Sequence, residues 1–201
     1  MELIQGESGV HKLDENFVRQ TIEYCKANDV LFIADEVQTG NGRTGRYFAY
    51  ENFDIKPDIV STAKGLAGGL PMGAVLFGEK VKDTVTPGSH GSTFGGNPVC
   101  AAGAISIVSR IDDEFLKSVR EKSEYIKNFL MNIKGVKSVS GMGLMLGVET
   151  QKDAKQIASE CLENGLLVLT AKTKIRLLPA LNISYLELDR GLKILKEVIE
   201  K

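Results

Sequence analysis

The sequence predicts an α/β protein in two parts: a glycine-rich α/β unit over residues 1–110 and a smaller α+β unit over residues 111–201. The first observation behind this class is that strand patterns and amphipathic helix patterns alternate along the 201 residues. Second, most of the 21 glycines lie between residues 40 and 103, as expected where loops surround a ligand. Third, glycine becomes sparse near residue 110, while lysine and glutamate become more frequent.

Helix and strand patterns begin close to the start of the first unit. Asp14 is a suitable N-cap for a helix over residues 15–28. Four residues are expected near the buried face of this helix: Phe17, Val18, Ile22 and Cys25. Residues 30–35 form a continuous apolar run that ends in an acid, which is typical of a strand buried on both faces.

The remainder of the first unit is expected to contain two strands and a helix. The strands are expected over residues 58–63 and 74–77. Loops are expected over residues 38–46, 65–73 and 88–96. Asn97 followed by Pro98 predicts a helix start, and the small residues that follow predict close packing of that helix.

The second unit is expected to begin with an amphipathic helix over residues 112–134 that Gly135 ends. Strands over residues 136–140 and 144–149 should follow, and then a helix over residues 153–164. The last expected elements are strands over residues 166–170 and 175–178 and a helix over residues 186–200.

Charge and composition exclude several classes of partner. Lysine and arginine number 25 against 26 acidic residues, so no basic excess predicts binding to nucleic acid or to an anionic membrane. The longest apolar runs are far shorter than a membrane span, and the first residues lack a signal-peptide pattern. Three widely spaced cysteines are typical of a reducing compartment, so a cytoplasmic location is expected. Two isolated histidines, His11 and His90, predict no metal site.

A carboxylate and an amine stand at the ends of two expected strands. Asp35 ends the run over residues 30–35, and Lys64 follows the strand over residues 58–63. Because the carboxyl ends of strands in an α/β sheet share one rim, where ligands bind, both side chains are expected to face one cavity. The spacing alone is equally compatible with a salt bridge between them or with two solvated strand ends.

The chemistry of this pair favours a ligand. A neutral lysine amine in a dry pocket can attack a carbonyl carbon and form an imine. An aspartate opposite a pyridine nitrogen keeps that nitrogen protonated, because the attraction at about 4 Å is roughly 4 kcal/mol at an effective dielectric constant near 20. Asp35 and Lys64 are therefore the two groups that pyridoxal 5'-phosphate requires of a protein.

Two local patterns suggest nucleotide binding but lack the context that it needs. Residues 40–45 fit G-x-G-x-x-G, yet residues 36–39 separate them from the expected strand and no helix pattern follows. The acids Asp35 and Glu36 are similar to the magnesium-binding strand end of P-loop ATPases, but the sequence has no G-x-x-x-x-G-K-[ST]. A nucleotide-binding domain at this loop remains the weaker alternative.

Four stretches, in this order, resemble the motifs of class-III, fold-type I aminotransferases. They lie at residues 31–45, 57–74, 90–98 and 176–179. The resemblance covers essentially the whole chain and is closest to the acetylornithine aminotransferase branch, followed by the ornithine branch. It implies the C-terminal part of a fold-type I large domain, with a mostly parallel sheet and helices, followed by a small α+β domain.

The resemblance implies a role for each matching residue in binding pyridoxal 5'-phosphate. Asp35 would pair with the ring nitrogen, Val37 would pack on the ring face, and Gln38 would hydrogen-bond near the 3′ oxygen. Lys64 would carry the cofactor and then move the proton between substrate and cofactor carbons. Thr93 would reach the phosphate, usually that of a neighbouring subunit.

Two further residues are implied to recognise substrate. Arg176 would bind the α-carboxylate of glutamate or 2-oxoglutarate with its planar guanidinium. Glu7 would pair with that arginine and help it to switch between the two substrates. The implied reaction converts N-acetylornithine and 2-oxoglutarate to N-acetylglutamate semialdehyde and glutamate. Alternatives are another ω-amino donor (ornithine, succinylornithine or 4-aminobutyrate) or a catalytically silent fragment that acts only in dimerisation.

The length of the sequence differs from that of the family. Family members are about twice as long, and this sequence matches their C-terminal half. The other half would supply the loop that cradles the phosphate and the aromatic residue that stacks on the ring. We therefore expect a fragment or split polypeptide with an incomplete cofactor pocket, which forms a homodimer or associates with the missing N-terminal half.

Overall fold

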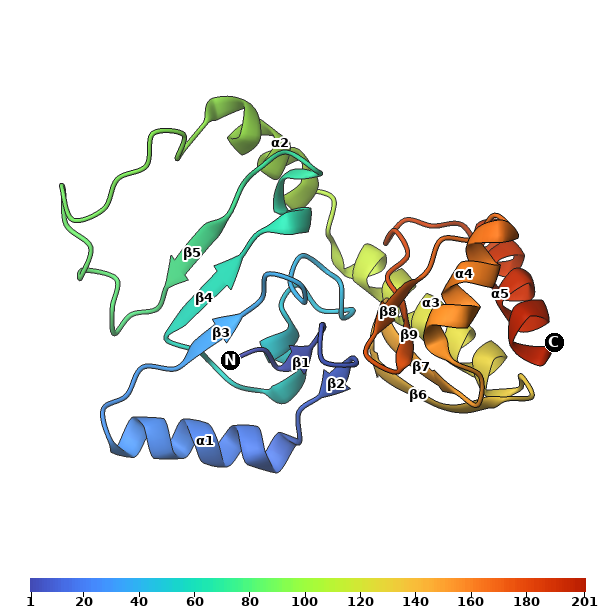
Figure 1. Cartoon of the computed structure of the whole chain (residues 1–201). Coiled ribbons are helices and arrows are strands. Elements are labelled where there is room, and N and C mark those ends of the chain that lie inside the picture. Colours follow the sequence, from blue (N-terminus) through green and yellow to red (C-terminus); the bar gives the residue numbers. More distant parts are fainter. The chain divides into compact units, whose positions relative to one another are not determined.

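The computed structural model describes residues 1–201 and divides into two compact units (Figure 1). Unit 1 comprises Met1–Leu3, Asp14–Gly42 and Arg46–Phe115, and unit 2 comprises Ile4–Leu13, Arg43–Gly45 and Leu116–Lys201. This division departs from a single boundary near residue 110 at two places. A segment near the N-terminus and three residues of the glycine-rich loop fold with the C-terminal part, because their contacts lie far away in the sequence.

Unit 1 begins its regular structure with helix α1 (Glu15–Ala27). The predicted N-cap is confirmed, since the Asp14 side chain accepts a hydrogen bond of 2.9 Å from the backbone N–H of Phe17. Val18 and Ile22, four residues apart, form the buried face as predicted. The prediction for Phe17 is wrong: its side chain is 51% exposed because it stands one position away from that face.

The sheet of unit 1 has three strands in the order β3-β4-β5. They are β3 (Ile33–Asp35), β4 (Ile59–Thr62) and β5 (Ala74–Phe77). β3 and β4 are parallel, whereas β4 and β5 are antiparallel. The prediction that the first strand is buried on both faces is wrong, because Ala34 is fully buried while Ile33 is 45% exposed on the opposite face.

Short helical segments follow two of these strands. They are the 3₁₀ turns η1 (Ala49–Phe53) and η2 (Lys64–Ala67). The helix predicted after Asn97 is α2 (Pro98–Val108). Asn97 caps α2 as predicted, accepting hydrogen bonds from Val99 and Cys100 N–H. The expected close packing is confirmed at Gly103, where a Cβ would lie 2.8 Å from Leu70 Cδ1.

Unit 2 contains a four-stranded antiparallel sheet in the order β6-β7-β9-β8. Its strands are β6 (Val136–Met142), β7 (Met145–Thr150), β8 (Leu169–Ala171) and β9 (Lys174–Leu177). Its helices are α3 (Asp113–Met131), which starts in unit 1, α4 (Ala154–Glu163) and α5 (Tyr185–Glu200). The structure contains no helix that is both long and apolar enough to cross a membrane.

A short hairpin near the N-terminus completes unit 2. It consists of β1 (Ile4–Gln5) and β2 (His11–Lys12), which pair antiparallel. Val10 between them packs against the sheet, because Cβ atoms at Gly141 and Gly147 would lie 2.8 Å and 3.0 Å from its side chain. The two glycines therefore let the hairpin approach the backbone of β6 and β7 closely.

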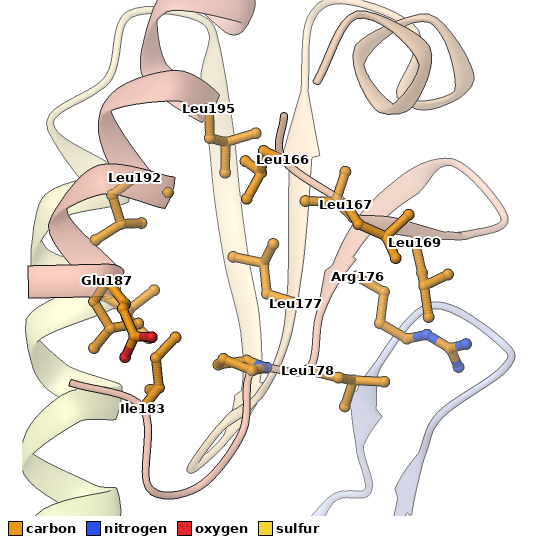
Figure 2. Close-up of a pocket in the computed structure, with 15 residues that line it drawn as sticks. Leu166, Leu167, Leu169, Arg176, Leu177, Leu178, Ile183, Glu187, Leu192 and Leu195 are labelled. Carbon is orange, nitrogen blue, oxygen red and sulfur yellow. The ribbon is translucent and has the colours of Figure 1, made fainter. Parts of the chain in front are cut away.

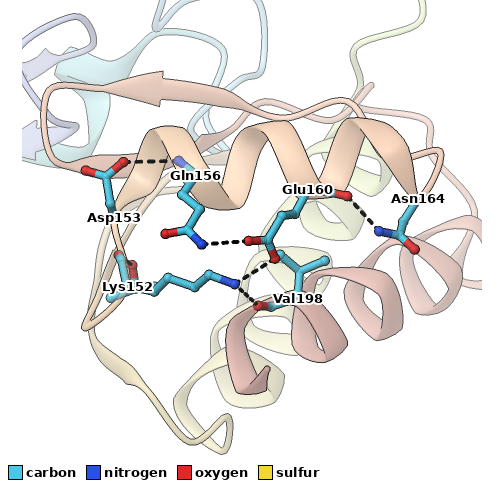
Figure 3. Close-up of polar contacts among 7 residues, drawn as sticks. Lys152, Asp153, Gln156, Glu160, Asn164 and Val198 are labelled. Atoms are coloured by element: carbon cyan, nitrogen blue, oxygen red, sulfur yellow. Dashed lines mark hydrogen bonds and ion pairs between the residues drawn. The ribbon is translucent and has the colours of Figure 1, made fainter.

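A polar cluster joins α4 to the end of α5 (Figure 3). The Lys152 ammonium donates to Glu160 Oε2 at 2.6 Å and to the Val198 carbonyl at 3.1 Å. Asp153 caps α4 by accepting from the N–H groups of Lys155 and Gln156. Since Val198 lies in the last turn of α5, Lys152 satisfies a carbonyl that has no partner within that helix.

The turn between β6 and β7 tolerates no side chain at Gly143. Its φ is +56°, and a Cβ there would lie 2.3 Å from the Arg43 carbonyl oxygen and 2.6 Å from Thr44 Cα. We expect Gly143→Ala to lower the free energy of unfolding by more than about 2 kcal/mol in chemical denaturation, because strain and overlap add.

Gly165 provides the matched control for this substitution. Its φ is +81°, but no atom lies within 4 Å of the position of a Cβ. Gly165→Ala should therefore cost only the conformational strain, roughly 1 kcal/mol. Equal losses of stability in the two variants would show that the close contact with residues 43–44 contributes nothing.

Candidate active site

Asp35 and Lys64 follow neighbouring parallel strands of unit 1. Asp35 is the last residue of β3 and pairs in register with Ser61 of β4. Lys64 comes two residues after the end of β4, at the first position of η2. Because the two strands run in the same direction, both residues lie at the carboxyl-terminal edge of the sheet, as expected for a ligand site.

The Asp35 carboxylate is fixed by its neighbours through one oxygen. Oδ1 accepts hydrogen bonds from the Val37 N–H at 3.1 Å and from the Ser61 hydroxyl at 3.3 Å. No hydrogen bond occupies Oδ2, and Asp35 forms no salt bridge with Lys64. The alternative of a salt bridge between the two strand ends is thus not realised, and one carboxylate oxygen is available to a donor.

Lys64 has a backbone conformation that is uncommon for a residue with a side chain. Its φ is +50°, in the left-handed region, and its side chain is exposed. The chain before it is held by Asn41, whose amide nitrogen donates to Thr62 Oγ1 at 3.0 Å and to the Ala63 carbonyl at 3.1 Å. Strain of this kind persists only where the surroundings hold the backbone, and it is often found at functional sites.

The other cofactor residues lie at different places in unit 1. Val37 and Gln38 are half-buried in the turn that directly follows Asp35. Thr93 is exposed in the long connection between β5 and α2, and no hydrogen bond links it to Asp35 or Lys64. Val37 and Gln38 therefore adjoin Asp35 through the chain, whereas the structure does not bring Thr93 to this group.

Glu36, which the sequence linked only to a P-loop-like strand end, is a buried carboxylate. Its oxygens accept hydrogen bonds from Thr39 Oγ1 at 2.5 Å, from Ala49 N–H at 3.0 Å and from Tyr50 N–H at 2.9 Å. The side chain thus connects the turn after Asp35 to the start of η1. Burial nevertheless raises the pKa of Glu36 above its ordinary value, against the opposing effect of these hydrogen bonds.

The raised pKa of Glu36 predicts a specific pH dependence of stability. The folded chain holds this proton more tightly than the unfolded chain, so the contribution is full below the ordinary glutamate pKa and is lost as the pH rises through the folded value. We expect Glu36→Gln to remove this part of the fall in unfolding free energy, measured by urea denaturation between about pH 4 and pH 8. Glu23→Gln, at an exposed position on α1, should leave the pH profile as it is.

Arg176 and Glu7 form an ion pair in unit 2. Arg176 Nη1 lies 2.7 Å from Glu7 Oε1, and the arginine side chain is 10% exposed against 73% for the glutamate. Arg176 lies in β9, and Glu7 lies in the hairpin between β1 and β2. The buried Nε of Arg176 has no hydrogen-bond partner, so the guanidinium keeps donor capacity beyond the pair.

An apolar cavity of about 290 Å³ borders the chain next to Arg176. Leucines and isoleucines from β9, α3, α5 and residues 166–169 form most of its lining. Figure 2 shows that the Arg176 guanidinium points away from Leu177, Leu192 and Leu195. Arg176 is nevertheless one of the residues that line this cavity, so its side chain borders the cavity while its guanidinium extends away from these leucines.

Arg43 is a residue that the sequence analysis did not single out. Its Nη1 donates to the carbonyls of Leu144 and Pro179, at 3.0 Å and 2.6 Å. Burial lowers the pKa of Arg43 to about 10, so the guanidinium stays charged at neutral pH. The glycine-rich motif drew attention to this loop, but no local pattern indicates contacts with residues about a hundred positions away.

The loop around Arg43 does not form a dinucleotide site. Residues 37–48 contain only turns and bends, and the next regular element is the short 3₁₀ turn η1 rather than an α-helix. A pyrophosphate would need backbone N–H groups at the start of such a helix. Nor does any group of three or more histidine, cysteine, aspartate or glutamate side chains lie close enough to hold a metal ion.

The residues of unit 1 fit pyridoxal 5'-phosphate chemically. An available oxygen of a fixed carboxylate, Asp35 Oδ2, can accept a hydrogen bond from a ring N–H. An exposed amine, Lys64 Nζ, can react with an aldehyde. The strand pairing places both groups at one edge of the sheet, which is the arrangement that this cofactor needs.

Comparisons with known proteins agree with this chemistry. The family described as "Aminotransferase class-III" matches residues 1–199. The acetylornithine aminotransferase of Haemophilus ducreyi is 46% identical over 100% of this chain and 52% of its own length. That of Aquifex aeolicus is 47% identical over 99% of this chain and 53% of its own length.

Solved structures show the same relationship. N-acetylornithine aminotransferase from Stenotrophomonas maltophilia superposes with a TM-score of 0.89 at 37% identity, covering 98% of this chain and 54% of the other. Ornithine aminotransferase from Plasmodium yoelii gives 0.90 at 33% identity, covering 100% and 56%. The chain spans about half the length of the curated relatives that it matches. The fold is therefore a part of the fold-type I architecture, and the chain belongs to the class-III aminotransferases.

Proposed function

We propose that this chain carries the lysine, the ring-pairing carboxylate and the carboxylate-binding arginine of a pyridoxal-phosphate-dependent transaminase. The observation that carries the proposal is the placement of Asp35 and Lys64 after neighbouring parallel strands. When bound, pyridoxal 5'-phosphate supplies an electron-withdrawing ring that stabilises negative charge on the substrate carbon. The residues of the protein bind the substrate and move the protons.

Asp35 holds the ring proton in this proposal. Ser61 and Val37 fix its Oδ1, so Oδ2 keeps one direction and accepts from the ring N–H without reorganisation. Val37 packs against the ring face, and Gln38 donates or accepts near the 3′ oxygen. Thr93 serves the phosphate of a neighbouring subunit, which is consistent with its exposure and its lack of hydrogen bonds to Asp35 and Lys64.

Lys64 attaches the cofactor and then acts as the acid and base of the reaction. With the cofactor bound, its amine would take a proton from the substrate carbon and return it to the cofactor carbon. The grip of Asn41 on the end of β4 restricts where the Lys64 backbone can move. A restricted lysine keeps its amine near both carbons, which lowers the entropic cost of each transfer.

Arg176 and Glu7 distinguish the two substrates of the cycle. A dicarboxylate such as 2-oxoglutarate offers Arg176 a carboxylate that can replace Glu7, and the largely exposed Glu7 can then turn into solvent. An ω-amino donor offers no carboxylate at this position, so the ion pair between Arg176 and Glu7 stays intact. A single site can thereby accept an anionic and an uncharged substrate end in turn.

We infer that the amino donor is N-acetylornithine and that 2-oxoglutarate accepts the amino group. The names of the relatives at 46% and 47% identity support this donor. Ornithine is the second candidate, because a structural neighbour at 33% identity is an ornithine aminotransferase. Succinylornithine and 4-aminobutyrate share the same amino end, so all four belong in one test.

Exposed apolar strands support the participation of further polypeptide. On β5, Val75 is 55% exposed and Phe77 is 43% exposed, and Ile33 of β3 is similarly uncovered. Apolar sheet faces of this kind are normally covered by other segments. We propose that an N-terminal half like that of the relatives covers them, and that the active form is a homodimer.

The donor assignment is tested by a substrate panel. The chain, alone and joined behind the N-terminal half of the Haemophilus ducreyi relative, is supplied with pyridoxal 5'-phosphate and 2-oxoglutarate. Glutamate formation is then followed with each of the four donors. We expect the highest kcat/KM with N-acetylornithine in the joined protein, and a higher value with ornithine would reverse the assignment. If the joined protein transfers no amino group to 2-oxoglutarate from any donor, the chain is a silent fragment.

A further inference from the structure

The end of the β7–β9 pair cannot close with its own backbone hydrogen bonds. Leu146 pairs with Leu177, so two residues further on Leu144 stands opposite Pro179. Pro179 has no N–H, and the Leu144 N–H donates instead to the Arg43 carbonyl at 3.0 Å. Neither residue therefore has a backbone N–H that can donate to the carbonyl of the other across the strands.

Arg43 provides the missing donors. One nitrogen, Nη1, donates to both opposing carbonyls, at 3.0 Å for Leu144 and 2.6 Å for Pro179. The adjoining Gly45 carbonyl accepts from the Arg120 guanidinium, which anchors the same tripeptide to α3. The side chain of Arg43 thus works as a clip that joins the start of β7 to the exit of β9.

Packing alone holds this exit incompletely. Leu177, Leu178 and Pro179 border the apolar cavity of about 290 Å³, so part of their surface meets no neighbouring side chain. Because this cavity is open to solvent on one side, the side chains that line it make fewer dispersion contacts there than side chains in a closed core. Arg176 immediately precedes this segment and pairs with Gly147 of β7 and Leu169 of β8, so a shift at the exit of β9 reaches its backbone through the adjoining Leu146–Leu177 pair.

We propose that Arg43 is a positioning residue for Arg176: by clipping Leu144 to Pro179, it fixes the strand that presents the substrate-binding guanidinium. This role rests on the proposed function of Arg176. Arg43 itself touches no substrate. Its effect reaches substrate through three residues of backbone, so it should alter dicarboxylate binding without altering cofactor attachment at Lys64.

The test compares Arg43→Met, Arg43→Lys and the control Arg46→Met, which changes an exposed arginine of the same loop. NMR hydrogen exchange of the Arg176 Nε–H is measured in each folded variant, together with 2-oxoglutarate affinity and borohydride-fixed labelling of Lys64 by pyridoxal 5'-phosphate. Arg43→Met should speed Nε–H exchange and weaken 2-oxoglutarate binding at least about tenfold, with labelling of Lys64 unchanged. The exchange rate and the 2-oxoglutarate affinity of Arg43→Lys should lie between those of Arg43→Met and the wild type, because the ammonium of the shorter lysine side chain still has donors for both carbonyls.

The outcomes separate the proposal from the function on which it rests. Unchanged Nε–H exchange in Arg43→Met overturns the proposal, as does a loss of Lys64 labelling equal to the loss of 2-oxoglutarate affinity. A third outcome is that the wild-type chain binds no 2-oxoglutarate, while Arg43→Met still speeds Nε–H exchange and Arg46→Met does not. Arg43 would then position Arg176 as proposed, but Arg176 would not bind the substrate.

Discussion

Replacing Lys64 with alanine is expected to abolish covalent attachment of pyridoxal 5'-phosphate to the chain. Lys64 is the amine that follows β4, at the same edge of the sheet as the Asp35 carboxylate. The measurement is borohydride fixation at stoichiometric cofactor, followed by mass mapping of the labelled peptide. In the protein joined to an N-terminal half, turnover should also fall by about 10²–10⁴-fold or more, the range for loss of a general acid–base group.

The control separates a specific site from the general reactivity of lysine. Lys56→Ala removes an exposed lysine of the same unit that follows no strand end and should leave the label on Lys64. Asp35→Asn keeps the shape of the side chain and removes its charge, so it should weaken labelling without moving it. A label spread evenly over the lysines, and insensitive to Asp35, would end the case for a cofactor site in unit 1.

The second large effect is expected at Arg176. Arg176→Met should weaken 2-oxoglutarate binding by roughly 10–100-fold, because a charge-assisted hydrogen bond contributes about 1.5–3 kcal/mol. Arg176→Lys should recover only part of the affinity, since an ammonium lacks the planar fork. Isothermal titration of each variant with 2-oxoglutarate measures the effect.

Two further variants test whether the ion pair limits this binding. Glu7→Gln removes the competing carboxylate 2.7 Å from Arg176 Nη1, so it should strengthen 2-oxoglutarate binding while Arg176→Met weakens it. Arg190→Met changes an exposed arginine of α5 and should neither strengthen nor weaken 2-oxoglutarate binding. Equal affinities in Glu7→Gln and the wild type would mean that Glu7 does not compete for the guanidinium.

Local signals in the sequence predicted most of the secondary structure. The caps at Asp14 and Asn97 act on the residues directly after them, so sequence and structure agree there. The strand at residues 74–77 is confirmed with the bounds predicted. Exposure was harder to predict: Ile33 has the apolar character of a core residue, but whether a strand face is covered depends on elements remote in the sequence.

The site was predictable only where its parts are close in sequence or follow paired strands. Asp35 and Lys64 could be placed together because parallel strands end at one edge. The contribution of Arg43 could not be foreseen, since its acceptors are backbone carbonyls, which every residue carries. The contacts of Glu36 could not be predicted for a related reason: apart from the Thr39 hydroxyl, its donors are backbone N–H groups of the next turn, which no particular side chain marks.

The interleaved composition of unit 2 restricts how the protein can be dissected. A piece cut to start at Leu116 would retain the whole four-stranded sheet but lose both Glu7 and Arg43. Such a truncation would leave the Arg176 guanidinium without its counter-ion and the Leu144 and Pro179 carbonyls without their donor. Glu7 and Arg43 leave the ribosome before the rest of unit 2 during synthesis. Unit 2 therefore completes its folding only when its C-terminal part binds segments that were made much earlier.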